Sequence, residues 1–348
     1  FFRILFIPFI IYHYILKRFL LLFLMKIVCF LIFSSISFCS GFNLFQDFVD
    51  YYAKTYVSDT EYREREIIFN KNKEIIENHY GSHSLSLNEY SDMTPYEFNS
   101  IMKGFQKNIV FEMGYSKKSC ASFQYQNEKL PEQKDWRDEN AVTPVKNQGQ
   151  CGSCWSFSAT GAIEGANAIS SGNLISLSEQ ELLDCSGKYG NFACSGGEMD
   201  SAFQYAMDNG LCSEEIVPYE AQRERCSSMP QCEAEVFVKK CVDVTPNNEL
   251  HLQEAVANQP VSIAIEADTR IFQFYSGGVI TDTSCGTDLD HGVLIVGYGE
   301  ENGFPYWLVK NSWGSDWGDN GYVKILRTNS TDNDGICGIA MQPSYVVC

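Results

Sequence analysis

The sequence is poor in positive charge. Its 348 residues include 26 Lys and Arg but 44 Asp and Glu, a formal net charge of −18. The imbalance lies late in the chain, where 12 basic residues from Leu130 onward face 31 acidic ones. Because attraction to a phosphate backbone requires the opposite sign of charge, this composition argues against nucleic-acid binding. It is compatible with an acidic compartment, where protonation of carboxylates relieves their mutual repulsion.

Other signals are missing as well. There are no internal repeats and no glycine-rich phosphate-binding loop, since Tyr298-Gly-Glu-Glu-Asn-Gly is typical of a turn. No uncharged stretch reaches the ~20 residues that a membrane-spanning helix needs, although 19–38, interrupted by Lys26, comes close. These absences disfavour repeat proteins and nucleotide-binding proteins, and we expect no stable membrane span.

The N-terminal region is apolar and resembles a targeting segment. Met25-Lys26 opens a compact pattern of one basic residue, an apolar run and then small residues, which predicts a signal peptide over 25–40. We therefore expect Met25 to be the true start and residues 1–24 to be an upstream extension. A type II membrane anchor is the alternative interpretation.

Residues 148–155, Gln-Gly-Gln-Cys-Gly-Ser-Cys-Trp, are the most informative segment. Cys154 precedes a run of small residues over 156–168 that predicts a helix. A sulfur at a helix N-terminus faces unpaired N–H groups and the positive end of the macrodipole, and both favour the nucleophilic thiolate. Gln148 lies upstream, where a turn could bring its amide beside the sulfur. This pattern predicts a cysteine hydrolase.

The Cys151-x-x-Cys154 spacing is also typical of a dithiol redox motif or of half a zinc site. A thiol protease needs two further groups, an imidazole that takes the proton and a residue that orients the imidazole. His291, in Leu-Asp-His-Gly-Val, and Asn311, in Lys-Asn-Ser-Trp-Gly, supply both. They favour the hydrolase over the other two interpretations, and we expect no metal ion and no cofactor.

With these motifs, the chain resembles a papain-family cysteine protease of the cathepsin L type from about residue 42 to its end. The resemblance implies that Cys154 is the nucleophile, His291 the general acid and base, and Asn311 the residue that orients the ring. It implies that Gln148 completes an oxyanion hole with the Cys154 N–H, and that Trp313 shields the Asn–His bond from water. The implied reaction is peptide hydrolysis through a thioester acyl-enzyme.

Residues 41–129 resemble the inhibitory propeptide of such zymogens. One motif places five residues at helical intervals, and a second follows it as Asn88-x-Tyr90-x-Asp92. The match departs from the family at Tyr80, Ser86 and Tyr90. Residues 103–129 are polar and irregular, as in a linker open to cleavage, so the mature peptidase domain is expected at 130–348. The five residues of the first motif are Glu61, Arg65, Phe69, Asn72 and Ile76.

The expected mature domain has two halves. Helical signals dominate from Cys154 to Gly210, including the capping box Ser178-x-x-Glu181. Strand signals dominate from Val236 onward. The expected fold is therefore α+β and two-lobed, papain-like, with a helical lobe and an antiparallel barrel-like lobe. Its active site would be the cleft between them, because each lobe supplies one of the two reacting groups.

The resemblance also implies a set of substrate-binding residues. Gly196 and Gly197 would bond to the substrate backbone, although a tight turn alone would explain them. The residues expected around the main pocket are mostly apolar or small, which favours a hydrophobic side chain at P2. Glu198, expected at the rim, could favour a basic one. The full set is Gly152, Gly196, Gly197, Glu198, Met199, Ala264, Leu289, Asp290, Gly292, Trp313 and Gln342.

Fourteen cysteines suggest an oxidising compartment, and eleven of them lie from residue 130 onward. The resemblance pairs Cys151 with Cys194, Cys185 with Cys226, and Cys285 with Cys337. With Cys154 set aside as the nucleophile, four cysteines then remain in that region, and four allow three connectivities. We favour the one that contains Cys212–Cys232 and leave Cys241 and Cys348 open. Asn329-Ser330-Thr331 is a candidate glycosylation site.

The expected product is a self-inhibited endopeptidase, because the chain has no inserted loop with paired histidines of the kind that gives dipeptide release. Expected partners are polypeptide substrates, the chain's own propeptide and cystatin-type inhibitors, and the enzyme is expected to be a monomer. Its expected location is the secretory pathway, with a lysosomal, vacuolar or extracellular destination. Two competing classes are a protease-like binding protein without turnover and a thiol–disulfide oxidoreductase that uses Cys151 and Cys154.

Overall fold

The computed structural model describes residues 45–106 and 120–348. The predicted signal peptide at 25–40 and the predicted extension at 1–24 lie outside the described residues. Of the helices that are described, none is both long and apolar enough to cross a membrane.

The contacts between residues define two compact units, Phe1–Thr55 and Tyr56–Cys348. The described helix of the first unit is α2 (Phe45–Tyr51), in which the rings of Phe45 and Phe48 stack with their centroids 5.8 Å apart. The second unit contains all the other elements, including most of the segment predicted as a propeptide.

The first propeptide motif forms one helix, α3 (Asp59–Glu77), as its spacing predicts. The helix begins after Ser58, whose hydroxyl accepts a hydrogen bond from the Glu61 N–H at 3.2 Å. Its buried residues are Phe69 and Asn72. The Asn72 amide donates to two backbone carbonyls of the loop that carries the second motif, each at 2.9 Å. The two motifs are therefore parts of one packed structure.

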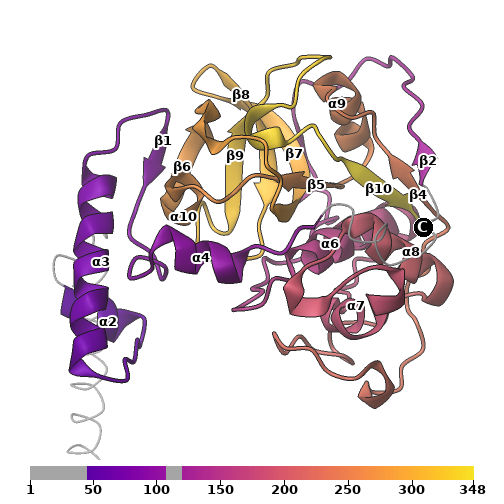
Figure 1. The fold of residues 1–348 in the computed structure, drawn as a ribbon. Coiled ribbons are helices and arrows are strands. Elements are labelled where there is room, and N and C mark those ends of the chain that lie inside the picture. The colour runs from indigo at the N-terminus through magenta and orange to yellow at the C-terminus, as the bar shows by residue number, and fades with distance from the viewer. Residues whose placement is uncertain (1–44, 107–119) are drawn as a thin grey trace, which may run out of the picture. The chain divides into compact units, whose positions relative to one another are not determined.

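Two elements that follow α3 pack against the sheet of the expected peptidase domain. Strand β1 (His83–Leu85) pairs antiparallel with β6 (Tyr275–Ile280). The Asn88 amide donates to the Gln273 carbonyl at 2.6 Å, and both groups are buried. The segment thus extends the sheet by one strand (Figure 1).

Helix α4 (Pro95–Met102) leads the chain toward the expected active site. Its N-terminus is a complete capping box formed by Thr94 and Glu97. Phe98 on this helix is buried and meets the Trp313 ring edge-on, with centroids 5.1 Å apart. The last turn of α4 therefore ends close to the Asn-Ser-Trp motif.

The helical half forms as predicted, and the remaining helices lie around the sheet (Figure 1). The small-residue run becomes a single long helix, which ends at Gly172 with a left-handed φ of +77°. The helices are α6 (Cys154–Ser171), α7 (Glu179–Cys185), α8 (Met199–Asn209), α9 (Glu249–Asn258) and α10 (Arg270–Phe274), with short 3-10 helices η1 (Ser186–Tyr189), η2 (Ala193–Ser195), η3 (Cys226–Ser228), η4 (Thr283–Cys285) and η5 (Ile336–Gly338).

The described strands form one ten-stranded sheet in the order β1-β6-β9-β8-β7-β5-β10-β4-β2, with β3 paired to β7. Most pairs are antiparallel, as predicted, but β6–β9 and β2–β4 are parallel. The strands not yet bounded are β2 (Ala121–Ser122), β3 (Lys134–Asp135), β4 (Lys240–Asp243), β5 (Val261–Ile265), β7 (His291–Glu301), β8 (Phe304–Lys310), β9 (Tyr322–Leu326) and β10 (Ser344–Val347).

Small residues let α6 lie directly against β5 and β7. A Cβ added to Gly161 would come within 2.7 Å of the Leu294 side chain. The Ser158 hydroxyl donates to the Val293 carbonyl at 2.6 Å, and the Ser262 hydroxyl donates to the Ser158 carbonyl at 2.8 Å. The helix that begins with Cys154 is thereby fixed against the strand that begins with His291.

Two hydrophobic clusters flank this contact. One lies within the sheet and under α9 and α10, and it contains Trp307, Trp313 and Trp317. The other lies between α6, α7 and α8, and it contains Trp155 and Phe203. The chain therefore has the mixed helix-and-sheet architecture expected from the sequence.

Five disulfides connect the described residues. The three that the resemblance implies are present, and so is the favoured Cys212–Cys232 pair. The fifth, Cys120–Cys241, was not predicted, because Cys120 lies upstream of residue 130, where the mature domain was expected to begin. Cys154 and Cys348 are the free cysteines of the described chain.

The β1–β6 pairing contains a buried histidine that predicts weaker propeptide docking in acid. His83 is 6% exposed, and neither of its ring nitrogens makes a hydrogen bond with a described residue. Burial, helped by the nearby His79 and opposed by Asp282, lowers the pKa of His83 to about 4. Docking should therefore be unaffected above about pH 6.5 and should weaken as the pH falls toward 4, by at least roughly tenfold.

Hydrogen exchange of the β1 and β6 amides in a Cys154→Ser zymogen would measure this effect. We expect exchange to accelerate between pH 7 and pH 5 after correction for the intrinsic rate. His83→Phe, which keeps an aromatic ring but cannot be protonated, should reduce that acceleration, whereas His251→Gln on α9 should not. Equal pH dependence in the His83→Phe variant and the parent would contradict the assignment.

Candidate active site

Cys154 is the first residue of α6 and is completely buried. The Gly292 N–H points at its sulfur and donates a hydrogen bond at 3.3 Å. Because Gly292 directly follows His291, this bond places the start of β7 beside the thiol. The thiol and the imidazole predicted from separate motifs are thus brought together by the packing of α6 against β7.

His291 is held by Asn311 in a single tautomer. The His291 Nε2 lies 2.8 Å from Asn311 Oδ1, and this oxygen also accepts the Ser312 N–H at 2.8 Å. Since an amide oxygen only accepts, Nε2 carries the proton, and Nδ1 is left with a lone pair. That Nδ1 is buried and makes no hydrogen bond with a described residue. The Trp313 ring covers the imidazole, with centroids 4.6 Å apart.

Gln148 is buried and fixed at both ends of its amide. Its Oε1 accepts a hydrogen bond from the Ser312 hydroxyl at 2.7 Å, and its Nε2 donates to the Cys151 carbonyl at 2.9 Å. The same Nε2 donates to the Met102 carbonyl of the propeptide segment at 3.2 Å. One donor of the predicted oxyanion hole is therefore occupied by a propeptide carbonyl.

Residues 103–106 of the propeptide segment lie across the site. The N–H groups of Gly104 and Phe105 donate to the Asp290 carbonyl at 3.2 and 3.0 Å. The Gly197 N–H donates to the Gly104 carbonyl at 2.8 Å, and the Gln106 N–H donates back to Gly197 at 3.0 Å. Gly197, predicted to bond to a substrate backbone, thus bonds to the propeptide instead.

The close approach at Gly104 admits no side chain. A Cβ at this position would lie 1.9 Å from the Gly152 carbonyl oxygen. Next to it, the Lys103 ammonium pairs with the carboxylates of Asp290 at 2.8 Å and Asp268 at 3.5 Å. Two of the predicted substrate-binding residues, Gly152 and Asp290, are therefore covered by this short segment.

Burial keeps the two reacting groups neutral in this state. It raises the pKa of Cys154 to about 12, and the N–H groups of Gly292, Trp155 and Gly104 only partly offset that effect. It also lowers the pKa of His291 to about 4, against the effect of the hydrogen bond that the ring donates to Asn311. Desolvation therefore outweighs the helix N-terminus that was expected to favour the thiolate.

The predicted pocket residues lie close together. Met199 and Ala264 are buried, and the half-buried Leu289 packs on the same cluster. A Cβ on Gly292 would meet the Met199 sulfur at 3.2 Å, and Gly196 lies under Gln106 of the propeptide.

Glu198 was expected at an exposed rim, but the structure buries it. The residue is 4% exposed, and the Gln342 amide donates to its carboxylate at 2.8 Å. Its backbone N–H is held by the Asn191 side chain at 2.8 Å, at the N-cap of α8, which turns the carboxylate inward. The predicted pocket thus contains a carboxylate paired with a neutral amide.

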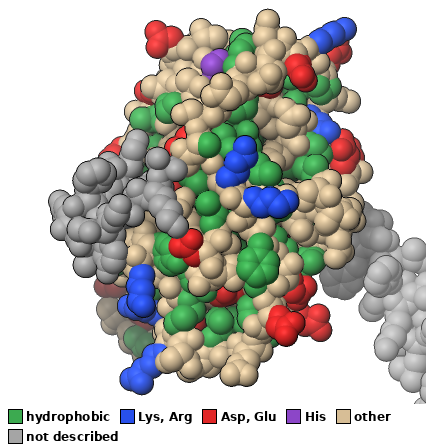
Figure 2. Space-filling view, turned by 90° about the vertical axis from the view of Figure 1, so that its right-hand side faces the viewer, with side chains coloured by type: hydrophobic (Ala, Val, Ile, Leu, Met, Phe, Trp, Pro, Cys, Tyr) green, Lys and Arg blue, Asp and Glu red, His purple; other side chains and the backbone are tan. Residues whose placement is uncertain are grey.

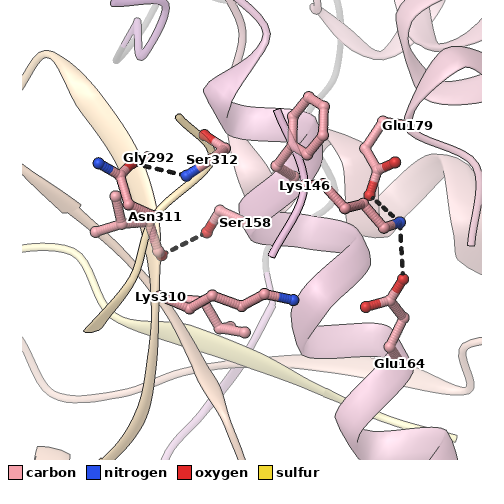
Figure 3. Close-up of a pocket in the computed structure, with 11 residues that line it drawn as sticks. Lys146, Ser158, Glu164, Glu179, Gly292, Lys310, Asn311 and Ser312 are labelled. Carbon is pink, nitrogen blue, oxygen red and sulfur yellow. Dashed lines mark hydrogen bonds and ion pairs between the residues drawn. The ribbon is translucent and has the colours of Figure 1, made fainter. Parts of the chain in front are cut away.

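A buried charged cluster beside α6 was not found from the sequence. The Lys146 ammonium donates to Glu164 at 3.1 Å and to Glu179 at 2.7 Å (Figure 3). It also donates to the Leu177 carbonyl at 2.9 Å. Burial opposes its charge, but the two carboxylates raise the pKa of Lys146. Lys310 lies nearby, and the group borders a cavity of about 20 Å³ that is also lined by Asn311 and Ser312.

The cluster fixes the loop before Cys154 and the start of α7 to the middle of α6. The one available signal was Glu164 itself, a lone charge within a run of small residues. A lone charge more often lies on the solvated face of a helix, so the sequence did not indicate a buried pair.

No group of described residues is suited to hold a metal ion. Two clusters contain three possible ligands each, but Cys212, Cys232 and Cys120 within them are bonded in disulfides. A disulfide sulfur is not the thiolate that binds a metal.

The chain is similar to known proteins along most of its length. Residues 130–347 match the family model described as papain family cysteine protease, and residues 45–98 match that of the cathepsin propeptide inhibitor domain (I29). Cysteine endopeptidase RepA of Oryza sativa subsp. japonica is 48% identical over 269 residues, 76% of this chain and 71% of that protein. A cathepsin L-like peptidase of Aedes aegypti is 46% identical over 312 residues, 84% of this chain and 89% of that protein.

Solved structures of precursors are also similar. Digestive procathepsin L 3 from Tenebrio molitor larval midgut superposes with a TM-score of 0.75 at 41% identity, covering 87% of this chain and 97% of that one. A recombinant stem bromelain precursor gives a TM-score of 0.77 at 36% identity with the same coverage.

The contact at Gly104 predicts that a side chain at this position weakens the shielding of Cys154 by the propeptide segment. In Gly104→Ala the new methyl group would collide with the Gly152 backbone, so residues 103–106 must move away from the site. We expect iodoacetamide to alkylate Cys154 in this zymogen at pH 7 roughly tenfold faster than in the parent, because water and reagent then reach the sulfur. Gly187→Ala is the matched control, since its Cβ would meet no atom within 4 Å. Equal rates in both variants would contradict the prediction.

Proposed function

Since this chain belongs to the papain family of cysteine proteases and carries its inhibitory propeptide, we propose that it hydrolyses internal peptide bonds through Cys154, His291, Asn311 and Gln148. The observation that carries the proposal is the hydrogen bond from His291 Nε2 to Asn311, which leaves Nδ1 without a hydrogen-bond partner among the described residues, while the N–H of the adjacent Gly292 donates to the Cys154 sulfur.

The reaction follows from these groups once residues 103–106 have left the site. Nδ1 of His291 takes the Cys154 proton, and the sulfur attacks the carbonyl carbon of the peptide bond. The resulting oxyanion accepts hydrogen bonds from the Gln148 amide, now released from Met102, and from the Cys154 N–H at the first turn of α6. His291 then donates its proton to the amine as the C–N bond breaks and a thioester remains.

Water completes the cycle. Nδ1 of His291 accepts a proton from a water molecule that attacks the thioester, the C–S bond breaks, and the thiol is restored as the acid leaves. Asn311 keeps the ring in one tautomer through both steps, and Trp313 excludes water from the bond between them.

The proposed substrates are polypeptides with a hydrophobic P2 residue. Met199, Ala264 and Leu289 supply an apolar wall, which supports this preference. Gly152, Gly196 and Gly197 admit a backbone at close range, as the contacts with residues 103–106 illustrate. Gln342 and Glu198 form the polar end of the same pocket.

We propose further that the enzyme is made in the secretory pathway and acts in a lysosome, a vacuole or outside the cell. The five disulfides among the described residues are typical of an oxidising compartment. Asn329 is exposed and accessible for glycosylation. We also propose that the enzyme is a monomer and that cystatin-type proteins inhibit it.

The oxidoreductase alternative finds less support. It needs Cys151 and Cys154 as an exchanging pair, but Cys151 is bonded to Cys194, and Cys154 is free. The binding-protein alternative is disfavoured because none of the four predicted catalytic residues is substituted.

Inhibition by an active-site epoxide would test the proposed catalysis. We expect the acid-activated protein to cleave a Leu-Arg or Phe-Arg fluorogenic peptide and to lose this activity when the epoxide alkylates Cys154. Cys154→Ser should neither process itself nor cleave the peptide, and His291→Ala should lower kcat/KM at least roughly a hundredfold. Cys348→Ser, which removes the other free cysteine, should keep full activity. Dithiol exchange that survives His291→Ala, without peptide cleavage, would instead support the oxidoreductase.

The polar end of the pocket predicts how P2 preference can be changed. In Gln342→Glu a second carboxylate would lie beside Glu198, and a guanidinium entering the pocket would relieve their repulsion. We expect the ratio of kcat/KM for P2 Arg over P2 Leu to rise roughly tenfold. Gln342→Met, of similar length but uncharged, should not raise the ratio. No change with Gln342→Glu would refute the pocket assignment.

A further inference from the structure

Residues 120–129 precede the expected start of the mature domain, yet they are bonded to that domain. The Cys120–Cys241 disulfide joins this segment to β4 across 121 residues of sequence. By contrast, the sequence contains no cysteine between Cys39 and Cys120. The inhibitory residues 45–106 therefore have no covalent bond of this kind to the peptidase domain.

The segment also completes the edge of the sheet. Strand β2 pairs in parallel with β4, with Ala121 opposite Val242 and Ser122 opposite Asp243. The Phe123 N–H extends this ladder by donating to the Asp243 carbonyl at 2.9 Å. Because β2 is the last strand on this side of the described sheet, its loss would leave β4 as an open edge.

Aromatic side chains fix the segment to α9 and β10. The Tyr125 ring stacks on His251, with centroids 4.4 Å apart and an interplanar angle of 17°. The Phe123 ring meets the Tyr345 ring edge-on, with centroids 6.3 Å apart.

The surface shown in Figure 2 has no large exposed hydrophobic patch. Its hydrophobic side chains lie singly or in small groups among polar ones.

A buried carboxylate of the peptidase domain takes hydrogen bonds from this segment. Glu254 on α9 is 2% exposed. Its two oxygens accept the Gln126 N–H at 2.7 Å and the Glu128 N–H at 3.4 Å. Departure of the segment would break both of these hydrogen bonds to a charged group, so the segment contributes to the stability of this part of the domain.

We propose that residues 120–129 stay with the mature peptidase as a structural strand held by Cys120–Cys241, while the inhibitory residues 45–106 depart. Cleavage upstream of Cys120 leaves the segment as an N-terminal extension. Cleavage near Leu130 leaves it as a separate peptide linked through the disulfide. In both cases the active enzyme contains more than residues 130–348. This inference rests on the proposed function only in assuming that maturation releases the inhibitory part.

Intact mass spectrometry of the matured full-length protein tests the proposal. The enzyme is activated, stopped with the epoxide and measured before and after reduction. We expect the unreduced mass to include residues 120–129 and a peptide map to contain the Cys120–Cys241 cross-link. An unreduced enzyme that begins near Leu130, lacks the segment and has Cys241 as a free, alkylatable thiol would overturn the proposal.

The same measurement separates this proposal from the proposed catalysis. A Cys154→Ser zymogen, which should not process itself, is cut in trans by a different endopeptidase and analysed in the same way. Retention of the segment there supports the structural role even if the wild-type chain shows no peptidase activity. Its loss there overturns the structural role, whatever the wild-type chain does.

A pair of variants tests whether the segment stabilises the mature enzyme. Cys120→Ser combined with Cys241→Ser removes the cross-link without leaving an unpaired partner, and Cys348→Ser is the control that removes a free thiol. We expect the Tm of the matured double variant to fall by roughly 5 °C or more relative to the control. Equal Tm values would overturn the structural role of the cross-linked strand.

Discussion

The contact between α6 and β7 is the constraint on which the active site depends. Cys154 begins the helix, and His291 begins the strand, so their separation is set by how closely the two elements pack. Gly161 permits that approach, and the Ser158 hydroxyl bonds across it. A larger side chain on this face of α6 would move the strand outward and separate the thiol from the imidazole. The run of small residues is therefore a requirement of the proposed active-site geometry as well as of packing.

The propeptide segment inhibits this site in two ways at once. It occupies groups that we propose to bind the substrate, since Gln148 and Gly197 both bond to its backbone. It also removes the site from water, which raises the pKa of Cys154 and lowers that of His291. A substrate that reached the site with the segment still bound would therefore find the Cys154 thiol and the His291 imidazole both neutral. Its departure frees the donors and restores solvation in the same step, so one event relieves both forms of inhibition.

Much of this arrangement could be predicted from the sequence, because short motifs carry it. The octet around Cys154 and the flanks of His291 and Asn311 identified the three groups, and their meeting follows from the fold of the family. The spacing in 61–76 likewise predicted one helix, and α3 is present.

The features that were missed depend on tertiary burial rather than on motifs. Glu164 and Glu198 carry charges that the sequence alone places at the surface, and only packing shows that Lys146 and Gln342 accompany them inside. Cys120–Cys241 was missed for a different reason. Cys120 lies before the expected start of the mature domain near residue 130, so it was not expected to pair with a cysteine of that domain.

That boundary separates two kinds of attachment. Upstream of it, the inhibitory part is held by reversible contacts: the β1–β6 pairing, the Phe98–Trp313 packing and the Lys103 ion pairs. Of these contacts, the Lys103–Asp290 ion pair weakens when the carboxylate takes up a proton. The β1–β6 pairing weakens when the buried His83 does, so acid favours release of the inhibitory part. The segment after Cys120 is held by a covalent bond that protons do not break. Acid therefore acts on the inhibitor and leaves the strand in place, which lets one precursor combine a removable inhibitor with a permanent structural addition.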